Sequence, residues 1–190
     1  RIVLPKRKVN SVEEFIKFFP EVKEVFPDAT ERVIERPKKS KQNGRSYSGK
    51  KKTHTRKNLV VVDEKKRILV VSPTKPGRRH DKNIADRIHL AETIPKHVSI
   101  WTDSGFQGVQ HKHPNTCIAK RGRKDKPLNE AEKEENRIIS AFRIGCEHAI
   151  GGMKKFRALS DRLRNKIGEF DDRLAVVAAG LWNYQLQYAR

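Results

Sequence analysis

The feature that most restricts the fold of this chain is a long stretch with helical spacing, from Leu128 to Met153. Residues separated by whole helical turns form two stripes along it. The apolar stripe consists of Ile138, Phe142, Cys146, Ala149 and Met153 and continues to Phe156. The polar stripe consists of Asn136, Ser140, Arg143, Glu147 and Lys154. One face of this helix can therefore be buried, while the other presents a lone carboxylate between two cations.

That carboxylate, Glu147, lies four residues after Arg143, and the pair has two interpretations. An Arg–Glu pair at this spacing is typical of an ordinary surface helix, where it adds about 0.2–0.5 kcal/mol. The alternative is a functional carboxylate. The spacing alone does not separate the two, and only the rest of the chain favours a function.

The composition indicates a polyanionic partner. The chain has 43 Lys and Arg against 23 Asp and Glu, a formal net charge of +20, which favours nucleic acid. Hydrophobic residues make up 35% of the chain, too many for a disordered basic tail and too few for a membrane protein. No apolar run approaches the roughly 18 residues of a spanning helix, and no signal peptide is recognised. Cys117 and Cys146 are isolated, so we expect reduced thiols and no zinc site.

The order of the expected elements predicts the fold class. Strands are expected over residues 22–35, 58–63, 67–72, 97–103 and 116–119, and helices over 11–19, 80–92, 128–153 and 171–188. The short turn after residue 63 makes the second and third strands an antiparallel hairpin. Pro27 in the first strand suggests a sheet edge or a bulge. Antiparallel strands extended by parallel ones and covered by helices predict an α/β, ribonuclease-H-like fold with a mixed five-stranded sheet.

Three acids fall where that fold places its chemistry. Asp28 lies on the first strand, Asp103 ends the fourth, and Glu147 lies on the late helix. An Asp that precedes a glycine turn, as Asp103 does, is also common for purely structural reasons. Carboxylates brought together from distant segments can hold two Mg²⁺ ions about 3.5–4 Å apart, because Mg²⁺ prefers hard oxygen ligands.

Two basic segments are candidates for contacts with phosphate. Residues 36–57 contain ten Lys or Arg and no acid, which predicts a loop or hairpin that faces solvent or phosphate. Such a segment can simply be a solvated flexible loop. Tyr47 and His54, interleaved among the cations, favour nucleic acid, because stacking and phosphate contacts use these residue types together. Residues 120–126 form a second basic loop.

Five short motifs in a fixed order carry a family resemblance. They are Asp28-Ala29-Thr30-Glu31, the segment YSGKKKTH from Tyr47 to His54, Gly77-Arg78-Arg79-His80-Asp81, Asp103-Ser104-Gly105-Phe106-Gln107-Gly108, and Arg143-x3-Glu147-x6-Lys154. Together they resemble the catalytic domain of insertion-sequence transposases of the DDE superfamily, in the branch that includes the Harbinger-like elements. The resemblance runs from about Val22 to Tyr188.

The chain departs from the family pattern at three positions. Ala29 stands where Gly is usual, Phe106 replaces a Tyr, and Ser140 stands where part of the family has a Tyr before the Arg. Phe106 keeps the aromatic ring of the usual Tyr but lacks its hydroxyl, whereas Ser140 has no aromatic ring. None of them touches a carboxylate.

The resemblance implies specific roles for site residues. It implies that Asp28, Asp103 and Glu147 are the catalytic, metal-binding triad and that Arg143 and Lys154 contact phosphate near the transposon end. His80 could orient a ligand, but it precedes Asp81, the expected N-cap of the next helix, and a residue in that place is more often structural. With the basic segments, the predicted DNA contacts are Lys50, Lys51, Lys52, His54, Arg121, Arg123, Lys124, Arg143, Lys154 and Lys155.

The sequence therefore predicts a Mg²⁺-dependent DDE transposase, an endonuclease and DNA strand transferase, with two Mg²⁺ ions that Mn²⁺ can replace. Its expected partners are double-stranded DNA, as terminal repeats and target, and at least a second copy of the chain, with no membrane. Residues 21–190 are expected to be the catalytic domain, and residues 1–20 a linker and helix from an N-terminal DNA-binding region. It would act on DNA in a bacterial cytoplasm, or in the nucleus of a eukaryotic host.

Two other functions remain open from the sequence. The first is a transposase-derived DNA-binding protein without catalysis. The second is another ribonuclease-H-like nuclease, which would hydrolyse its substrate without joining DNA strands.

Overall fold

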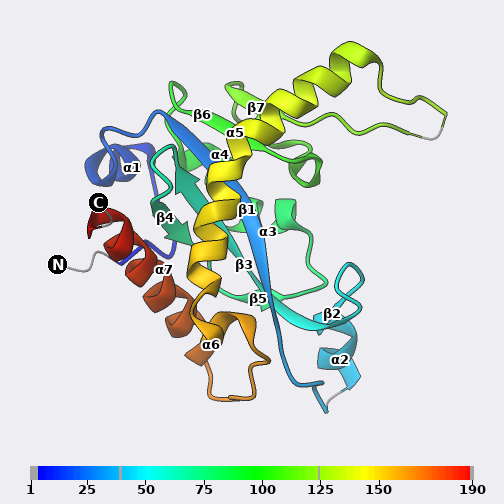
Figure 1. Cartoon of the computed structure of the whole chain (residues 1–190), viewed down its shortest axis with the longest axis vertical. Helices are drawn as coiled ribbons and strands as arrows, with labels where there is room; N and C mark the ends of the chain where they lie inside the picture. The colour runs from blue at the N-terminus through cyan, green and yellow to red at the C-terminus, as the bar shows by residue number, and fades with distance from the viewer. Residues whose placement is uncertain (1–3, 39, 124, 189–190) are drawn as a thin grey trace.

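The computed structural model describes residues 4–38, 40–123 and 125–188. Its centre is a mixed sheet in the order β2-β3-β1-β6-β7, with β4 and β5 also paired to β3 (Figure 1). The strands are β1 (Glu24–Val33), β2 (Tyr47–Ser48), β3 (Thr53–Asp63), β4 (Ile68–Val71), β5 (Lys75–Pro76), β6 (Ser99–Thr102) and β7 (Thr116–Ile118). The helices are α1 (Val12–Phe18), α2 (Ser40–Ser46), α3 (Asp81–Arg87), α4 (Leu90–Thr93), α5 (Glu130–Lys154), α6 (Arg157–Ser160) and α7 (Phe170–Tyr188). Short 3₁₀ turns, η1 (Ser104–Phe106) and η2 (Val109–His111), follow β6.

The pairing of β1 confirms the ribonuclease-H-like arrangement. β1 pairs antiparallel with β3 from Val25 to Val33 and parallel with β6 at Glu24 and Val25, and β6 pairs parallel with β7. Together with β4, these are the five strands that the sequence predicts, and β2 and β5 are additions of two residues each. Pro27 lies just beyond the residues of β1 that pair with β6, a position that tolerates a proline.

Two hydrophobic clusters lie on opposite faces of the sheet. Side chains alternate between faces along a strand, so Val25 joins the cluster with α3 and α4, while Phe26 joins the cluster with α5 and α7. Phe15 of α1 packs into the first of these clusters. By the same alternation Asp28 lies on the face that α5 covers, and Glu31 lies on the other face.

Helix α5 is confirmed as the long predicted helix, but its burial is only half as expected. It begins with a reciprocal capping box between Asn129 and Glu132, and its C-terminal half is buried through Cys146, Ala149 and Met153. Ile138 and Phe142, expected to be buried on the same stripe, are 49% and 47% exposed. The N-terminal half of α5 projects beyond the sheet (Figure 1), so this part of the stripe is only partly covered, with the Phe142 ring stacked on Trp101 at 4.4 Å.

Other local expectations fail for reasons of backbone geometry. The basic segment expected as a loop or hairpin contains helix α2 before the β2–β3 hairpin. The helix expected over residues 80–92 begins at Asp81, with His80 and not Asp81 as its N-cap residue. It divides into α3 and α4 because His89 has a positive φ of 56°.

The closing helix α7 packs mainly through small residues. Val177 is 48% exposed, while Ala175, Ala178 and Ala179 are buried. Close contact with α5 explains this difference, since the ring of Trp182 lies directly against Gly152. Small side chains allow two helices to approach in this way.

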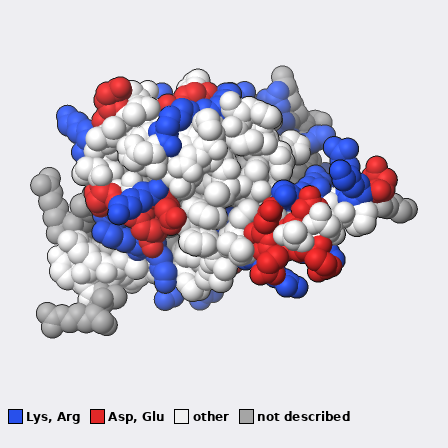
Figure 2. All heavy atoms as spheres, turned by 90° about the horizontal axis from the view of Figure 1, so that it is seen from above, with Lys and Arg blue, Asp and Glu red and all other residues white. Residues whose placement is uncertain are grey.

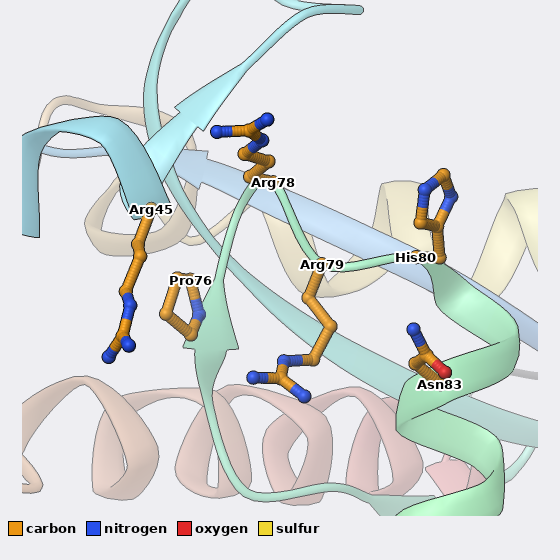
Figure 3. Close-up of a pocket in the computed structure, with 6 residues that line it drawn as sticks. All are labelled: Arg45, Pro76, Arg78, Arg79, His80 and Asn83. Atoms are coloured by element: carbon orange, nitrogen blue, oxygen red, sulfur yellow. The ribbon is translucent and has the colours of Figure 1, made fainter.

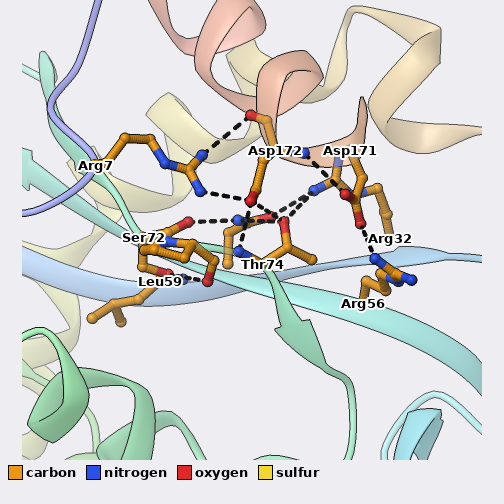
Figure 4. Close-up of polar contacts among 10 residues, drawn as sticks. Arg7, Arg32, Arg56, Leu59, Ser72, Thr74, Asp171 and Asp172 are labelled. Carbon is orange, nitrogen blue, oxygen red and sulfur yellow. Dashed lines mark hydrogen bonds and ion pairs between the residues drawn. The ribbon is translucent and has the colours of Figure 1, made fainter. Parts of the chain in front are cut away.

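The first turn of α7 is tied to the sheet by polar contacts (Figure 4). The carboxylate of Asp172 pairs with Arg7 at 2.7 Å and accepts hydrogen bonds from the backbone N–H and hydroxyl of Thr74 at 2.7 and 2.5 Å. Its neighbour Asp171 pairs with Arg56 of β3 at 2.8 Å. The N-terminal segment, the centre of the chain and the C-terminal helix therefore meet at one point.

Charge is unevenly distributed over the surface. In Figure 2, charged side chains of both signs gather towards the edges of the face in view, and the centre of that face is largely uncharged. The charged side chains are therefore not evenly spread over this face, although the net charge of the chain is +20. Among the described residues, no helix is both long and apolar enough to cross a membrane.

Candidate active site

Asp28 lies on β1 in a position that disfavours its ionised form. Its side chain is 23% exposed and faces α5, where the Nη2 atom of Arg143 lies 3.4 Å from its Oδ2 atom. Burial raises the pKa of Asp28, and the carboxylates of Asp103 and Asp81 add to this effect. The Arg143 guanidinium and the Ala29 N–H oppose it, but the pKa remains above its usual value.

Asp103 follows β6 directly and caps the turn η1. One of its carboxylate oxygens accepts a hydrogen bond from the Gly105 N–H at 2.9 Å. The structural interpretation of this Asp is therefore correct at the level of the backbone. The carboxylate lies near Asp28 because β1 and β6 are parallel neighbours, and the register that pairs Glu24 with Ser99 brings Asp28 level with Asp103.

Glu147 lies on an exposed part of α5, one residue after the buried Cys146. The Cys146 thiol donates a hydrogen bond to the Phe26 carbonyl at 3.3 Å, which fixes this turn of α5 against β1. Burial raises the pKa of Cys146, and both Asp28 and Glu147 contribute to the rise. Asp28 and Glu147 therefore both lie near the Cys146 thiol.

The carboxylates do not form a ready metal cage. In the described part of the chain, no group of three or more His, Cys, Asp or Glu side chains is arranged to hold a metal ion. Arg143 occupies the position beside Asp28 instead. The donors are nevertheless carboxylate oxygens, which suit a hard divalent cation. The positive charge of such an ion would offset both the cost of burying the Asp28 carboxylate and its repulsion by the neighbouring carboxylates, the two causes that raise its pKa.

Two predicted DNA-binding cations converge near the acids from different elements. Lys154, at the end of α5, is half-buried, and its pKa is lowered by burial and by the nearby Lys51. Glu31 and Asp28 oppose this shift. The β2–β3 hairpin and the C-terminal end of α5 therefore lie close to each other, although they are far apart in sequence.

The remaining predicted DNA contacts lie on the surface, in two separate loops and at one helix end. Lys50, Lys51 and Lys52 are exposed at the tip of the β2–β3 hairpin, where the Tyr47 and His54 rings meet edge to face at 5.5 Å. Arg121 and Arg123 are exposed between β7 and α5, and Lys155 is exposed after α5. Lys124 lies outside the described residues.

A buried ion-pair cluster on β3, which no local sequence pattern indicates, joins the first motif to the third. Lys57 on β3 contacts Asp81 at 2.8 Å and Glu31 at 3.2 Å, and it donates a hydrogen bond to the Arg79 carbonyl at 3.1 Å. Glu31 also accepts a hydrogen bond from Thr55 at 2.7 Å. Glu31 and Lys57 are direct cross-strand partners, a signal that requires the strand register.

That cluster is charged in the folded state. Burial works to raise the pKa of Glu31, but hydrogen bonds from Thr55 and Ser48 and the charge of Lys57 lower it overall. Burial works to lower the pKa of Lys57, but Asp81 and Glu31 raise it overall. The predicted supporting residue Asp81 thus fixes the start of α3 to β3, while His80 is exposed beside it.

Comparisons with known proteins point to one family. A family model described as a DDE superfamily endonuclease matches residues 27–183. A protein of Microchaete diplosiphon, described as the probable transposase for insertion sequence element IS702, is 32% identical over 191 residues. That alignment covers 97% of this chain and 66% of the relative, so the chain spans a little under two thirds of the relative's length. No solved structure matches the chain significantly.

Proposed function

Because this chain belongs to the DDE superfamily of endonucleases, we propose that it is the catalytic part of a DNA transposase, with Asp28, Asp103 and Glu147 as its catalytic carboxylates. The observation that carries this proposal is the environment of Asp28. Burial and the neighbouring Asp103 raise its pKa, so the fold keeps an acid where its ionised form is disfavoured. Such acids are typical of functional sites rather than of purely structural positions.

The proposed cofactor is a pair of Mg²⁺ ions, which Mn²⁺ can replace. When bound, such ions help to activate the attacking oxygen and stabilise the leaving oxygen in a displacement at phosphorus. The chain supplies carboxylate oxygens from β1, from the end of β6 and from α5. Arg143, already beside Asp28, presents a guanidinium that suits a phosphate oxygen at the same place.

One site can serve both chemical steps of transposition. Water would cut the phosphodiester bond at the element end, and the freed 3′-hydroxyl would then attack the target DNA. Both steps are in-line displacements at phosphorus, so they need the same arrangement of carboxylates and cations.

The basic surface is proposed to hold DNA backbones without reading their sequence. Lys50, Lys51 and Lys52 are exposed at the tip of the β2–β3 hairpin, and Arg121 and Arg123 are exposed between β7 and α5. Exposed Lys and Arg side chains of this kind suit contacts with phosphate. Residues 21–190 would be the catalytic domain and residues 1–20 its lead-in from a recognition region. Two element ends must be processed together, so we propose at least a dimer on double-stranded DNA.

The direct test is cleavage of DNA by the full chain. We expect the chain to nick supercoiled plasmid in the presence of Mg²⁺ or Mn²⁺. Asp103→Asn and Glu147→Gln should each reduce nicking by at least about 100-fold, since a lost metal ligand removes several kcal/mol of transition-state stabilisation. Glu134→Gln is the matched control, because Glu134 is an exposed acid on the same helix that pairs only with Arg137.

A second arm separates the alternative functions. A labelled duplex that ends in the 3′-hydroxyl of the inverted repeat bracketing the gene should be joined to plasmid DNA. Nicking without joining would indicate another ribonuclease-H-like nuclease. Binding with no metal-dependent nicking would indicate a DNA-binding protein without catalysis and would overturn the proposal.

A further inference from the structure

A basic pocket is formed by the end of α2, the turn after β5 and the start of α3, on residues that the proposed DNA contacts do not include. Its lining consists of Arg45, Pro76, Arg78, Arg79, His80 and Asn83, called here the arginine pocket, and its volume is about 360 Å³. Figure 3 shows Arg45 and Arg79 on either side of Pro76, with their guanidinium groups extending in the same direction. No acidic residue lines the pocket.

The arginines of the pocket differ from two nearby cations of β3, which are paired with acids. Lys57 pairs with Glu31 and Asp81, and Arg56 pairs with Asp171. Within the described residues, by contrast, the guanidinium groups of Arg45, Arg78 and Arg79 make no ion pair or hydrogen bond with another side chain. Several like charges gathered in a concavity without a counter-charge repel one another, and an anion would relieve that repulsion.

The backbone that carries these arginines is firmly held. The Gly77 N–H donates to the Thr55 carbonyl at 2.9 Å, and the Arg78 N–H donates to the Arg45 carbonyl at 3.2 Å. A Cβ atom at Gly77 would lie 1.8 Å from the Thr55 hydroxyl, so the turn sits directly on β3. The Lys57 ammonium of β3 donates a hydrogen bond to the Arg79 carbonyl, which also ties the turn to β3. The fold therefore fixes the backbone positions from which these arginines extend, while Arg45 and Arg78 remain exposed.

The same contacts place the pocket next to the catalytic strand. Thr55 and Lys57, which hold the turn, are both bound by Glu31, three residues after Asp28 on β1. The turn that carries the pocket is therefore attached to the strand that carries Asp28, through side chains on the face of the sheet opposite that acid.

We propose that the arginine pocket binds a backbone phosphate of the DNA strand, with Arg45 and Arg79 as the two side chains that clamp it. Arginine suits this role, because its planar guanidinium donates paired hydrogen bonds to phosphate oxygens. The inference rests on the proposed function in that the anion is a phosphodiester of DNA. It adds a positioning site that the sequence motifs do not assign.

The test is the salt dependence of DNA binding by the full chain. The Arg45→Gln/Arg79→Gln variant should bind a labelled duplex at least about tenfold more weakly than the wild type in anisotropy titrations. Its slope of log K against log salt should fall by about one to two, since two phosphate contacts are lost. The matched control, Arg87→Gln/Arg173→Gln, removes two exposed arginines on α3 and α7 and should keep the wild-type slope.

Thermal unfolding checks that both variants remain folded, and neither should change the midpoint, because these side chains make no stabilising contacts. An unchanged slope in the Arg45→Gln/Arg79→Gln variant overturns the pocket. The proposal is also overturned if inorganic phosphate stabilises the wild type against heat through these arginines, but their substitution leaves the slope of log K against log salt for DNA binding unchanged.

Failure here is distinguishable from failure of the proposed function. Metal-dependent nicking with an unchanged slope leaves the transposase proposal standing and removes only the pocket. A reduced slope in a chain that never nicks DNA supports the pocket and removes catalysis.

Discussion

Gly151 and Gly152, adjacent in α5, have opposite surroundings. A Cβ atom at Gly152 would lie 2.0 Å from the Trp182 ring, whereas nothing lies within 4 Å of one at Gly151. The close approach of α7 therefore explains Gly152. Packing does not explain Gly151, and its exposed position leaves room for a ligand such as a phosphate.

Substitution by alanine should separate the two glycines. Gly152→Ala forces the Trp182 ring aside and should reduce the free energy of unfolding by about 1–3 kcal/mol. Gly151→Ala should increase it by about 0.5–1 kcal/mol, because alanine is the better helix former. Urea unfolding measures both, and equal effects of the two substitutions would contradict the packing described here.

At the scale of elements, the first turn of α7 shows how one helix end joins distant parts of the chain. Burial works to raise the pKa of Asp172, but hydrogen bonds from Thr74 and Arg7 lower it overall. An acid whose folded pKa is lowered contributes stability that is fully present above the unfolded pKa. That contribution is lost as the pH falls through the folded value.

Asp172→Asn should therefore destabilise the protein mainly above about pH 4, near the ordinary pKa of an aspartate. We expect a loss of about 1–3 kcal/mol at pH 7, typical of hydrogen bonds to a charged group. The difference from the wild type should shrink as the pH falls below 4. Asp161→Asn, which removes an exposed acid paired with Arg157, should change stability by less than about 1 kcal/mol. A constant difference across the pH range would argue against the lowered pKa.

At the scale of the whole molecule, the proposed site depends on three segments that only the fold brings together. β1, the end of β6 and the middle of α5 each supply one acid. Without metal, the raised pKa of Asp28 means that folding disfavours its ionised form, with burial as the main cause. A divalent cation bound there would instead join the segments and stabilise the folded state.

Asp28→Asn should consequently have opposite effects with and without metal. In metal-free buffer at pH 7 the variant should unfold at a higher temperature than the wild type, because asparagine carries no charge into the site. Added Mn²⁺ should raise the unfolding temperature of the wild type. At a Mn²⁺ concentration of 100 times Kd, binding adds about 2.7 kcal/mol to the free energy of unfolding. The variant should respond much less, and Glu134→Gln should respond like the wild type. Equal responses of all three proteins would remove Asp28 from the proposed metal site.

The sequence by itself determined the elements whose signals are local. The β3–β4 hairpin, the strand that ends at Asp103, and the long helix α5 follow from alternation, turn residues and helical spacing. The acids of the proposed site were named from their places in this order of elements and from short motifs. Their roles stay a prediction, but their positions on β1, after β6 and on α5 are as expected.

Only the tertiary structure decided which of these residues meet. Ile138 and Phe142 carry a good apolar pattern, yet they are exposed because α5 extends past the edge of the sheet. Glu31 and Lys57 look like unrelated charges until the β1–β3 register places them opposite each other. The arginine pocket likewise depends on a turn docked on β3. A local pattern reports what a few neighbouring residues prefer, whereas burial and pairing depend on segments that approach from elsewhere in the chain.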